Sequence, residues 1–277
     1  MIDLKNVCFT YQKESTVKDI SFHIGKGEFV AIIGSNGAGK TTLSKLLNGI
    51  LKPCSGTVSI MGMDTKKTKT SILARHIGFL FQNPDRQICK NTVADEIRFG
   101  LEQILKDKSL IQQRLDNVIA YFGFDPAANP FRLSRGERQK LALASVIAAE
   151  PEVLVLDEPT TGLDYSECMQ IMNIIRQLNE KGITVVMVCH DMEVVLDFAR
   201  RVLVLSEGRL IADGETREIF RQEEVLRRAS ILPPQITQLA LRLGEGFEQV
   251  FTVEEMARNL LARTRPQYIG TVRRETA

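Results

Sequence analysis

Residues 34–41 read Gly-Ser-Asn-Gly-Ala-Gly-Lys-Thr and follow the apolar run Phe29–Ile33. The run predicts a buried strand, and the segment Thr42–Gly49 after the loop predicts a helix. The spacing G-x-x-x-x-G-K-T is that of a phosphate-binding loop, in which glycines let successive backbone N–H groups turn toward an anion. The N-terminus of the following helix adds its positive dipole end. The pattern predicts that Lys40 reaches the β- and γ-phosphates of a nucleotide and that the Thr41 hydroxyl ligates Mg²⁺.

The composition narrows the class of protein. The chain has 277 residues, of which 44% are hydrophobic and 25% charged, which is ordinary for a globular chain of one large domain or two. The formal charge of +2 and the absence of tryptophan give no reason to expect nucleic acid as a partner. The longest apolar runs have the length of strands, far short of the ~20 residues of a membrane span.

The cysteines and the start of the chain bear on its location. The five cysteines form no C-x-x-C pair, so we expect free thiols in a reducing compartment. The start, Met1–Lys5, is not a signal peptide. These features predict a cytosolic chain that reaches a membrane only through a partner.

Strand patterns occur on both sides of the phosphate-binding loop. Ile2–Tyr11 alternates apolar and polar residues apart from a slip around Asn6, and Ile20–Ile24 alternates throughout, so both predict half-buried antiparallel strands. The further strands that we expect are Ser55–Ile60, Ile77–Phe81, Val153–Leu156 and Ile183–Cys189, with a hairpin of Val202–Leu205 and Arg209–Ala212.

Between residues 83 and 149 the pattern turns helical, as at Val93, Ile97 and Leu101. Ser134 is a natural N-cap with Glu137 three residues on, a capping box that opens a helix at Lys140–Ala149. The other expected helices are Met169–Leu178, Glu215–Phe220 with an extension toward Leu226, Ile236–Leu241 and Val253–Ala257, and a polar tail from Arg263 is expected to fray.

Two carboxylates, Asp157 and Glu158, end the apolar run Val153–Leu156. A continuously apolar strand predicts a parallel sheet covered on both faces, and ligands of such sheets bind at the carboxyl ends of the strands. Adjacent residues at a strand end project in different directions. One carboxylate can therefore hold a metal ion while the other faces a water molecule.

Taken together, these motifs resemble the nucleotide-binding domain of ABC transporters over roughly Ile2 to Phe220. The resemblance implies an α/β fold: a P-loop NTPase core with an antiparallel β subdomain, an inserted helical subdomain and a short C-terminal extension. It implies an ATP-binding domain at residues 1–220, with its helical subdomain at about 83–149, and an extension at 221–277. It also implies an ATPase that uses ATP and Mg²⁺.

The resemblance gives each motif a role. Glu158 is the expected catalytic carboxylate, His190 the switch histidine at the γ-phosphate, and Gln82 the Q-loop residue near Mg²⁺ and the attacking water, with Lys40 completing the catalytic set. The expected metal ligands are Thr41, Gln82 and Asp157. The expected nucleotide-binding residues are Tyr11, Gly34, Ser35, Asn36, Gly37, Ala38, Gly39, Lys40, Thr41, Thr42, Ser134, Gly136 and Asp164.

The position of Tyr11 in the sequence by itself favours an aromatic side chain at a sheet edge that only packs against its neighbours. Only the resemblance to the family assigns Tyr11 to stacking on adenine.

The segment Leu133–Glu137 departs from the common signature L-S-G-G-Q, because Arg135 replaces the first glycine and Glu137 the glutamine. Ser134 and Gly136, which the family uses to contact the γ-phosphate held by the other subunit, are retained. Arg135 and Glu137 are expected to tune the rate or to pair with each other.

Within the ABC class, Phe81–Gln87 resembles the F-Q-N-P-D-x-Q run of energy-coupling factor (ECF) transporters, as do Leu232–Thr237 and Phe251–Glu255 near the C-terminus. The ATPases of that group serve importers of vitamins, cobalt or nickel. The implied partners are a second ATP-binding subunit, identical or paralogous, in a head-to-tail dimer, a transmembrane scaffold subunit and a substrate-binding membrane subunit. The implied location is the cytoplasmic face of the membrane.

Other classes fit the sequence less well. An ATPase of another ABC importer or exporter stays open. A soluble ABC protein of DNA repair would carry a long coiled coil within the cassette, and one of translation would carry two cassettes. A P-loop kinase would not explain Ser134–Gly136, and a regulatory module with a dead site would not retain Lys40, Asp157, Glu158 and His190.

Overall fold

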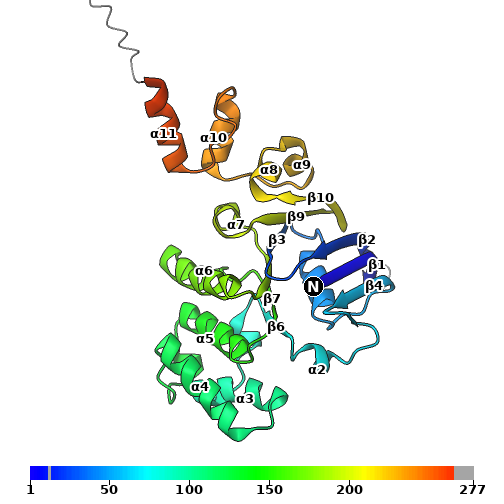
Figure 1. Ribbon diagram of the computed structural model, residues 1–277, viewed down its shortest axis with the longest axis vertical. Helices are drawn as coiled ribbons and strands as arrows, with labels where there is room; N and C mark the ends of the chain where they lie inside the picture. The colour runs from blue at the N-terminus through cyan, green and yellow to red at the C-terminus, as the bar shows by residue number, and fades with distance from the viewer. Residues whose placement is uncertain (12–13, 265–277) are drawn as a thin grey trace, which may run out of the picture.

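The computed structural model describes residues 1–11 and 14–264, which form two sheets and the helices around them (Figure 1). The strands are β1 (Ile2–Tyr11), β2 (Glu14–Ile24), β3 (Phe29–Gly34), β4 (Ser55–Ile60), β5 (Met63–Asp64), β6 (Ile77–Leu80), β7 (Val153–Asp157), β8 (Thr184–Val188), β9 (Arg201–Ser206) and β10 (Arg209–Glu215). The helices are α1 (Lys40–Leu47), α2 (Thr70–Leu73), α3 (Val93–Ile104), α4 (Lys108–Phe122), α5 (Arg135–Ile147), α6 (Tyr165–Glu180), α7 (Met192–Phe198), α8 (Thr216–Phe220), α9 (Glu223–Arg228), α10 (Gln235–Leu243) and α11 (Val253–Thr264), with 3₁₀ turns at η1 (Pro84–Arg86) and η2 (Pro130–Arg132).

The larger sheet has the strand order β10-β9-β3-β8-β7-β6, in which the pairs β9·β3, β3·β8, β8·β7 and β7·β6 are parallel. Consecutive residues of a strand face opposite sides, and here both sides are covered. Val30 and Ile32 belong to the cluster shared with the antiparallel sheet, while Ala31 and Ile33 belong to the cluster shared with α6 and α7. The prediction of a parallel sheet buried on both faces is confirmed.

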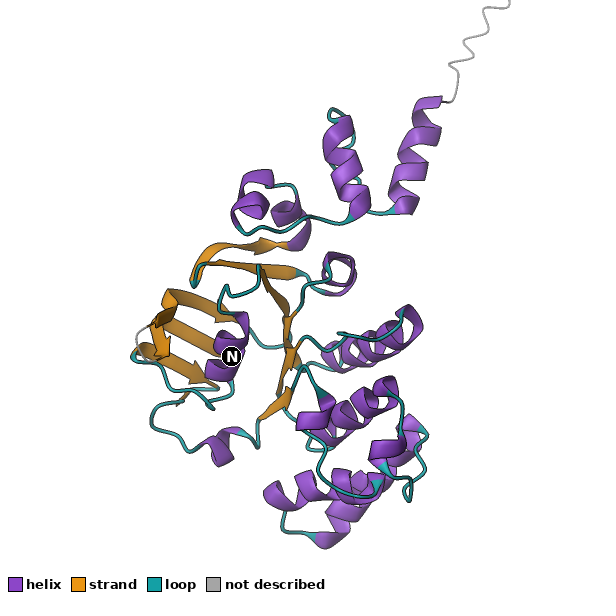
Figure 2. Ribbon diagram, turned by 180° about the vertical axis from the view of Figure 1, so that it is seen from behind, coloured by secondary structure: helices purple, strands orange, loops and turns teal. Residues whose placement is uncertain are grey.

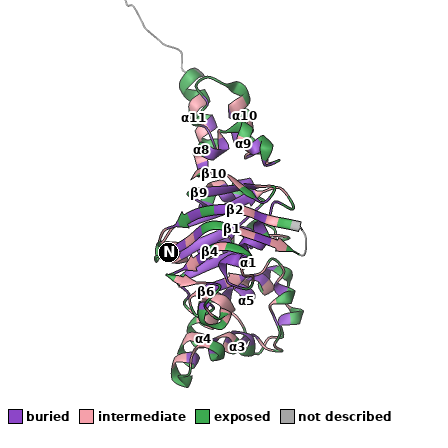
Figure 3. Ribbon diagram, turned by 90° about the vertical axis from the view of Figure 1, so that its right-hand side faces the viewer, coloured by how far each residue is buried: buried purple, intermediate pink, exposed green. Residues whose placement is uncertain are grey.

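The smaller sheet, β2-β1-β4-β5, is antiparallel and packs on one face of the larger one (Figure 2). Its register shifts between Leu4 and Val7, where Asn6 adopts a positive φ of 48°. This irregularity is the slip that the alternation predicted. In Figure 3 the buried residues concentrate in the strands and in the helices that pack against them.

The helices α3, α4 and α5 form a block beside β6 and carry their own apolar cluster, with Val93, Ile97 and Leu115 at its centre (Figure 1). Helix α5 has a second role, because its Ala142 and Leu143 belong to the core of the parallel sheet. The α5 helix therefore joins the helical block to the sheet that carries the site.

Several predicted boundaries were wrong because capping residues begin helices earlier than apolar periodicity does. Helix α5 begins at Arg135 rather than Lys140, since Ser134 caps it, and α6 begins at Tyr165 rather than Met169, since Asp164 caps it. Strand β2 begins at Glu14 rather than Ile20.

The predicted helix at 215–226 is two helices, α8 and α9. The break between them lets Phe220 and Leu226 both reach the main core.

The C-terminal segment is not uniform. Phe220, Leu226 and Phe251 belong to the core of the parallel sheet, whereas α10 and α11 extend away from it and share a small cluster of their own (Figure 1). Arg263, expected to begin a frayed tail, lies in α11, donates to the Glu245 carbonyl at 3.2 Å and lies over the Phe247 ring. The rest of that predicted tail, 265–277, lies outside the described residues, and the division of the chain at residue 220 stays a prediction.

Among the described residues, no helix combines the length and the apolar character needed to cross a bilayer.

We expect Gly78→Ala to destabilise the fold. A Cβ on this buried β6 residue would lie 2.5 Å from Val146 Cγ1 of α5 and 2.9 Å from Leu154 Cδ2 of β7, so the interface must open, at a cost of about 1–3 kcal/mol. Gly100→Ala in α3 is the matched control, because its Cβ has ordinary space (3.6 Å from the Ser145 carbonyl oxygen) and alanine favours a helix by up to about 1 kcal/mol. Urea denaturation checks both signs, and a Gly78→Ala chain as stable as the parent would contradict this packing.

Candidate active site

The loop between β3 and α1 is shaped by glycines. Gly34, Gly37 and Gly39 have φ values of 156°, 80° and 97°, which other residues rarely adopt. A Cβ on Gly34 would meet the Leu205 carbonyl oxygen at 2.4 Å. Gly39 is the N-cap residue of α1 and provides no side-chain cap. The first N–H groups of α1 are therefore left to bind an anion, as the sequence pattern predicts.

The side chain of Lys40 lies inside the phosphate-binding loop and hydrogen-bonds to its backbone. Its side chain is buried, and Nζ donates to the carbonyl oxygens of Gly34 at 2.7 Å and Ser35 at 2.9 Å. Burial lowers the pKa of Lys40, and the nearby carboxylates of Glu158 and Asp157 oppose that shift. The ammonium is thus held at the mouth of the loop, where phosphate oxygens would replace the carbonyls.

Asp157 lies buried at the end of β7 and faces the start of α1. The Thr41 hydroxyl donates to its Oδ1 at 3.4 Å. Burial raises the pKa of Asp157, and the neighbouring charge of Glu158 raises it further. A buried carboxylate beside a hydroxyl provides two hard oxygen ligands. A bound cation would offset the cost of burying the carboxylate charge.

This pair fits Mg²⁺, which binds through one or two protein oxygens together with substrate phosphates and water. Gln82, whose amide donates to Glu158 and which lines the same pocket as Thr41 and Asp157, would supply a third oxygen. The described residues contain no group of three or more His, Cys, Asp or Glu side chains that could hold a metal by themselves.

Glu158 is the point at which four segments meet. Its Oε2 accepts from Gln82 Nε2 at 2.6 Å and from Thr161 Oγ1 at 3.0 Å, and it lies 3.4 Å from His190 Nδ1. Gln82 follows β6, Glu158 follows β7 and His190 follows β8, so the parallel sheet brings them to one edge. Glu158 also has φ 52°, and such strain in a non-glycine residue concentrates at functional sites.

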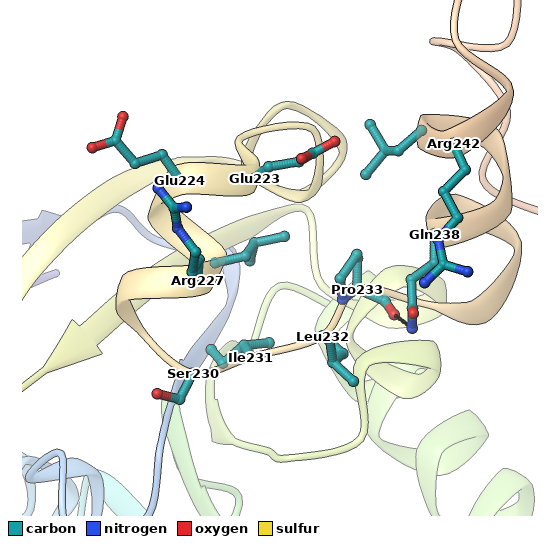
Figure 4. A pocket seen from close by; sticks show the side chains of 11 residues that line it. Glu223, Glu224, Arg227, Ser230, Ile231, Leu232, Pro233, Gln238 and Arg242 are labelled. Atoms are coloured by element: carbon teal, nitrogen blue, oxygen red, sulfur yellow. Dashed lines mark hydrogen bonds between the residues drawn. The ribbon is translucent and has the colours of Figure 1, made fainter.

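A pocket of about 400 Å³ opens at this edge and includes Thr41, Gln82 and Asp157. It is lined further by Lys45, Phe81, Asn83, Arg86, Arg135 and Thr161. The chain has a larger cavity of about 740 Å³, far from this chemistry, between α9 and α10 (Figure 4). Leu226 and Ile231 are among the residues that line it, and it contains none of the residues of the phosphate loop or of the acid pair.

The remaining predicted residues lie in different places. Tyr11 pairs with Glu14 across β1 and β2, and the carbonyl oxygen of Thr16 lies 2.7 Å from where a Gly39 Cβ would be, so this end of the antiparallel sheet adjoins the phosphate loop. The Tyr11 ring is 44% exposed and packs edge-on against Phe9. Of the other loop residues, Asn36 and Gly37 are exposed, and Ala38 and Thr42 are buried.

The signature residues do not line the pocket of their own chain, apart from Arg135. Ser134 Oγ accepts from the Glu137 N–H at 3.1 Å, and Glu137 Oε2 accepts from the Ser134 N–H at 2.7 Å, which is the predicted capping box. The expected pairing of Arg135 with Glu137 was wrong. Arg135 instead donates to the carbonyl oxygen of Thr161, because Glu137 is already committed to the cap.

Asp164 forms a second capping box, at the start of α6. Its Oδ1 accepts a hydrogen bond from the backbone N–H of Glu167 at 2.8 Å, and the backbone N–H of Asp164 donates to Glu167 Oε2 at 3.3 Å. Its assignment to nucleotide binding stays a prediction.

Thr161 was missed as a site residue. The only signal in the sequence is its position three residues after Glu158 in a loop, which does not by itself predict that its hydroxyl contacts the carboxylate.

Geometry and fold together define a P-loop nucleotide-binding fold of the ABC class. Residues 17–161 match the ABC transporter family. The chain is 40% identical over 269 residues to the energy-coupling factor transporter ATP-binding protein EcfA of Methanothermobacter thermautotrophicus, covering 94% of this chain and 86% of that protein. The chain belongs to the ABC transporter family of ATP-binding proteins.

Solved structures agree with this family. The cbiO1 protein of Clostridium perfringens, part of the ABC transporter complex cbiONQ, is 33% identical with a TM-score of 0.73, over 86% of this chain and 97% of that chain. The ATP-binding cassette MJ0796, dimeric and bound to ADP and phosphate, is 28% identical with a TM-score of 0.70, over 78% of this chain and 99% of that chain.

Some relatives are longer than this chain. A putative ABC transporter ATP-binding protein of Caldanaerobacter subterraneus is 41% identical over 260 residues, which are 92% of this chain but only 45% of that protein. The chain therefore spans about half the length of such relatives.

We expect Asp157→Asn to stabilise the nucleotide-free protein at neutral pH. Because the folded state raises the pKa of Asp157, the cost of its charge accumulates as the pH rises from the ordinary pKa toward the raised one and is complete above it, and asparagine does not carry this cost. The gain in melting temperature should shrink as the pH is lowered and the carboxyl becomes protonated. Asp116→Asn on the exposed face of α4 is the control and should show no such trend. A lower melting temperature for Asp157→Asn at pH 7 would contradict this reading.

Proposed function

We propose that this chain hydrolyses ATP as one of two ATP-binding subunits of an ECF-type membrane importer of a vitamin or a transition-metal ion. The observation that carries the enzymatic part is the carboxylate of Glu158, held by Gln82 and Thr161 beside His190, at the edge of the sheet where the phosphate loop ends.

The binding part of the reaction uses the phosphate loop. The free N–H groups at the start of α1 and the ammonium of Lys40 would neutralise charge on the β- and γ-phosphates. Thr41 and Asp157 would hold Mg²⁺. A bound Mg²⁺ supplies Lewis-acid stabilisation of the charge on the phosphate oxygens.

The chemical part uses Glu158. Its carboxylate would accept a proton from a water that attacks the γ-phosphate in line with the leaving oxygen. Gln82 and Thr161 donate to the same oxygen, Oε2, and so leave Oε1 for the water. His190, exposed beside Glu158, would donate to a γ-phosphate oxygen.

The active unit would be a head-to-tail dimer. Ser134 and Gly136 do not line the pocket that contains Thr41 and Asp157, and in the proposed dimer the signature motif of the second chain would close the site. The dimeric cassette MJ0796 bound to ADP and phosphate supports such an arrangement. ATP would stabilise the closed dimer, and hydrolysis would reopen it.

The ECF assignment rests on similarity to EcfA and on the segment after β6. In that segment Asn83 caps η1, Gln87 Nε2 donates to the Ala142 carbonyl at 3.1 Å, and Asp85 pairs with Arg138 at 2.8 Å. The segment is therefore fixed to α5, where a membrane subunit could push on it. The proposed partners are a transmembrane scaffold subunit and a substrate-binding membrane subunit, with this chain at the cytoplasmic face.

The half-length match to putative ABC transporter ATP-binding proteins favours a second candidate, the ATPase of another kind of ABC transporter.

Glu158→Gln should abolish steady-state ATP hydrolysis and leave ATP binding unchanged, because the water loses its base while the phosphate loop is untouched. A phosphate-release assay and titration with a fluorescent ATP analogue measure the two properties. Glu180→Gln at the end of α6 is the control and should hydrolyse ATP normally. Hydrolysis at the parent rate by Glu158→Gln would refute the proposed role.

Ser134 should act on the nucleotide of the partner chain. In a mixed dimer with Ser134→Ala on one chain and Lys40→Ala on the other, both lesions fall on one composite site and the second site stays complete. With both substitutions on one chain, each site carries one lesion. Single-turnover hydrolysis should be greater in the first arrangement.

The capping role alone predicts something else for Ser134. Ser134→Ala would then only destabilise α5, by about 1 kcal/mol, and the two arrangements would hydrolyse ATP equally. Equal hydrolysis, or the reverse order, would show that Ser134 does not act in trans.

A further inference from the structure

The first two turns of α5 lie against the loop that follows Glu158. Gln139 Nε2 is buried and donates to the Pro159 carbonyl at 3.0 Å. Gly136 faces Glu167 so closely that a Cβ on Gly136 would lie 2.3 Å from the Glu167 carboxyl carbon. The start of α5 is therefore fixed against the loop and helix that follow Glu158 in its own chain.

Arg135 makes the contact nearest to the catalytic edge. Its Nε and Nη2 both donate to the Thr161 carbonyl oxygen, at 3.3 Å and 3.0 Å. The guanidinium lies against Gly162, where a Cβ would come within 2.8 Å of Nε and 2.9 Å of Cζ. Gly162 has φ 74°, a left-handed conformation that bends the loop where the guanidinium lies.

Thr161 connects this contact to the carboxylate. Its hydroxyl donates to Glu158 Oε2 at 3.0 Å, and its own N–H donates to the Glu158 carbonyl at 3.3 Å. Glu158 is held in a left-handed conformation (φ 52°), which persists only where the surroundings over-determine it. Arg135 therefore holds the backbone carbonyl of Thr161, the residue whose hydroxyl holds the Glu158 carboxylate in place.

We propose that Arg135 is a positioning residue for ATP hydrolysis in its own chain, acting on Glu158 through Thr161. The common signature has glycine at this position and cannot make this contact, whereas one guanidinium supplies two N–H groups to one carbonyl. One signature loop then serves both sites of the dimer: Ser134 acts on the partner's nucleotide, and Arg135 supports the carboxylate of its own chain. The inference rests on the proposed function.

A double-mutant cycle tests the proposal. Arg135→Ala and Thr161→Val should each lower kcat about tenfold, or about 1.4 kcal/mol in the barrier. The double variant should fall no further than either single one, because both act on the same group. ATP affinity, from titration with a fluorescent analogue, and melting temperature should stay at parent values, which a merely structural role would not allow.

Other variants serve as controls. Thr161→Ser keeps the hydroxyl and should restore most of kcat. Arg135→Lys keeps the positive charge but lacks the paired N–H groups, so its kcat should fall as far as that of Arg135→Ala. This lysine variant also tests the proposal if the alanine variant folds poorly. Arg132→Ala, an exposed arginine three residues before Arg135, should hydrolyse ATP as the parent does.

Parent kcat in Arg135→Ala and Arg135→Lys would overturn the proposal. So would a hundredfold loss in the double variant, which means independent effects, or a loss that appears in ATP affinity rather than in kcat. Glu158→Gln separates this failure from that of the proposed function. If Glu158→Gln is inactive while the Arg135 variants are normal, only the role of Arg135 is refuted; if Glu158→Gln is active, the assigned chemistry is refuted as well.

Discussion

The parallel pairing of β6, β7, β8 and β3 is the constraint on which the site depends. In-register parallel strands end at the same edge, so Gln82, Glu158, His190 and the phosphate loop meet there although they are far apart in the chain. The register is fixed by apolar residues buried on both faces, since a shift by one residue would exchange the two faces and separate the side chains. Packing between the sheets and helices thus sets the geometry of the proposed catalytic carboxylate.

The same edge carries features that cost stability. Asp157 is buried beside Glu158, Lys40 is partly desolvated, and Glu158 adopts a left-handed backbone conformation. The cost of the buried charges of Asp157 and Lys40 would be relieved when a phosphate and a cation arrive, because these charges would then be paired. The site is therefore built for a ligand of high charge, and folding elsewhere in the core offsets the cost when no ligand is bound.

The sequence predicted those parts of the site whose chemistry is local. The phosphate loop, the acid pair after an apolar strand and the capping box at Ser134 each follow from residues within a few positions of one another. The Arg135–Thr161 contact could not be predicted, because it depends on how α5 packs against a loop 26 residues away, and the link from Thr161 to Glu158 depends on a loop conformation that the sequence pattern does not specify. For the same reason the core role of α8 and α9 was missed: their apolar residues are too few to show a period, and only the packing reveals that Phe220 and Leu226 are buried.

A crystal structure of the Glu158→Gln chain with ATP and Mg²⁺ tests the central claim most directly, since it locates the γ-phosphate relative to the sheet edge. The account predicts that the γ-phosphate lies within hydrogen-bond reach of Lys40 and His190, with Mg²⁺ on Thr41 and with the side chain of residue 158 facing the line of attack. A nucleotide bound elsewhere, or a γ-phosphate directed away from residue 158, would contradict it.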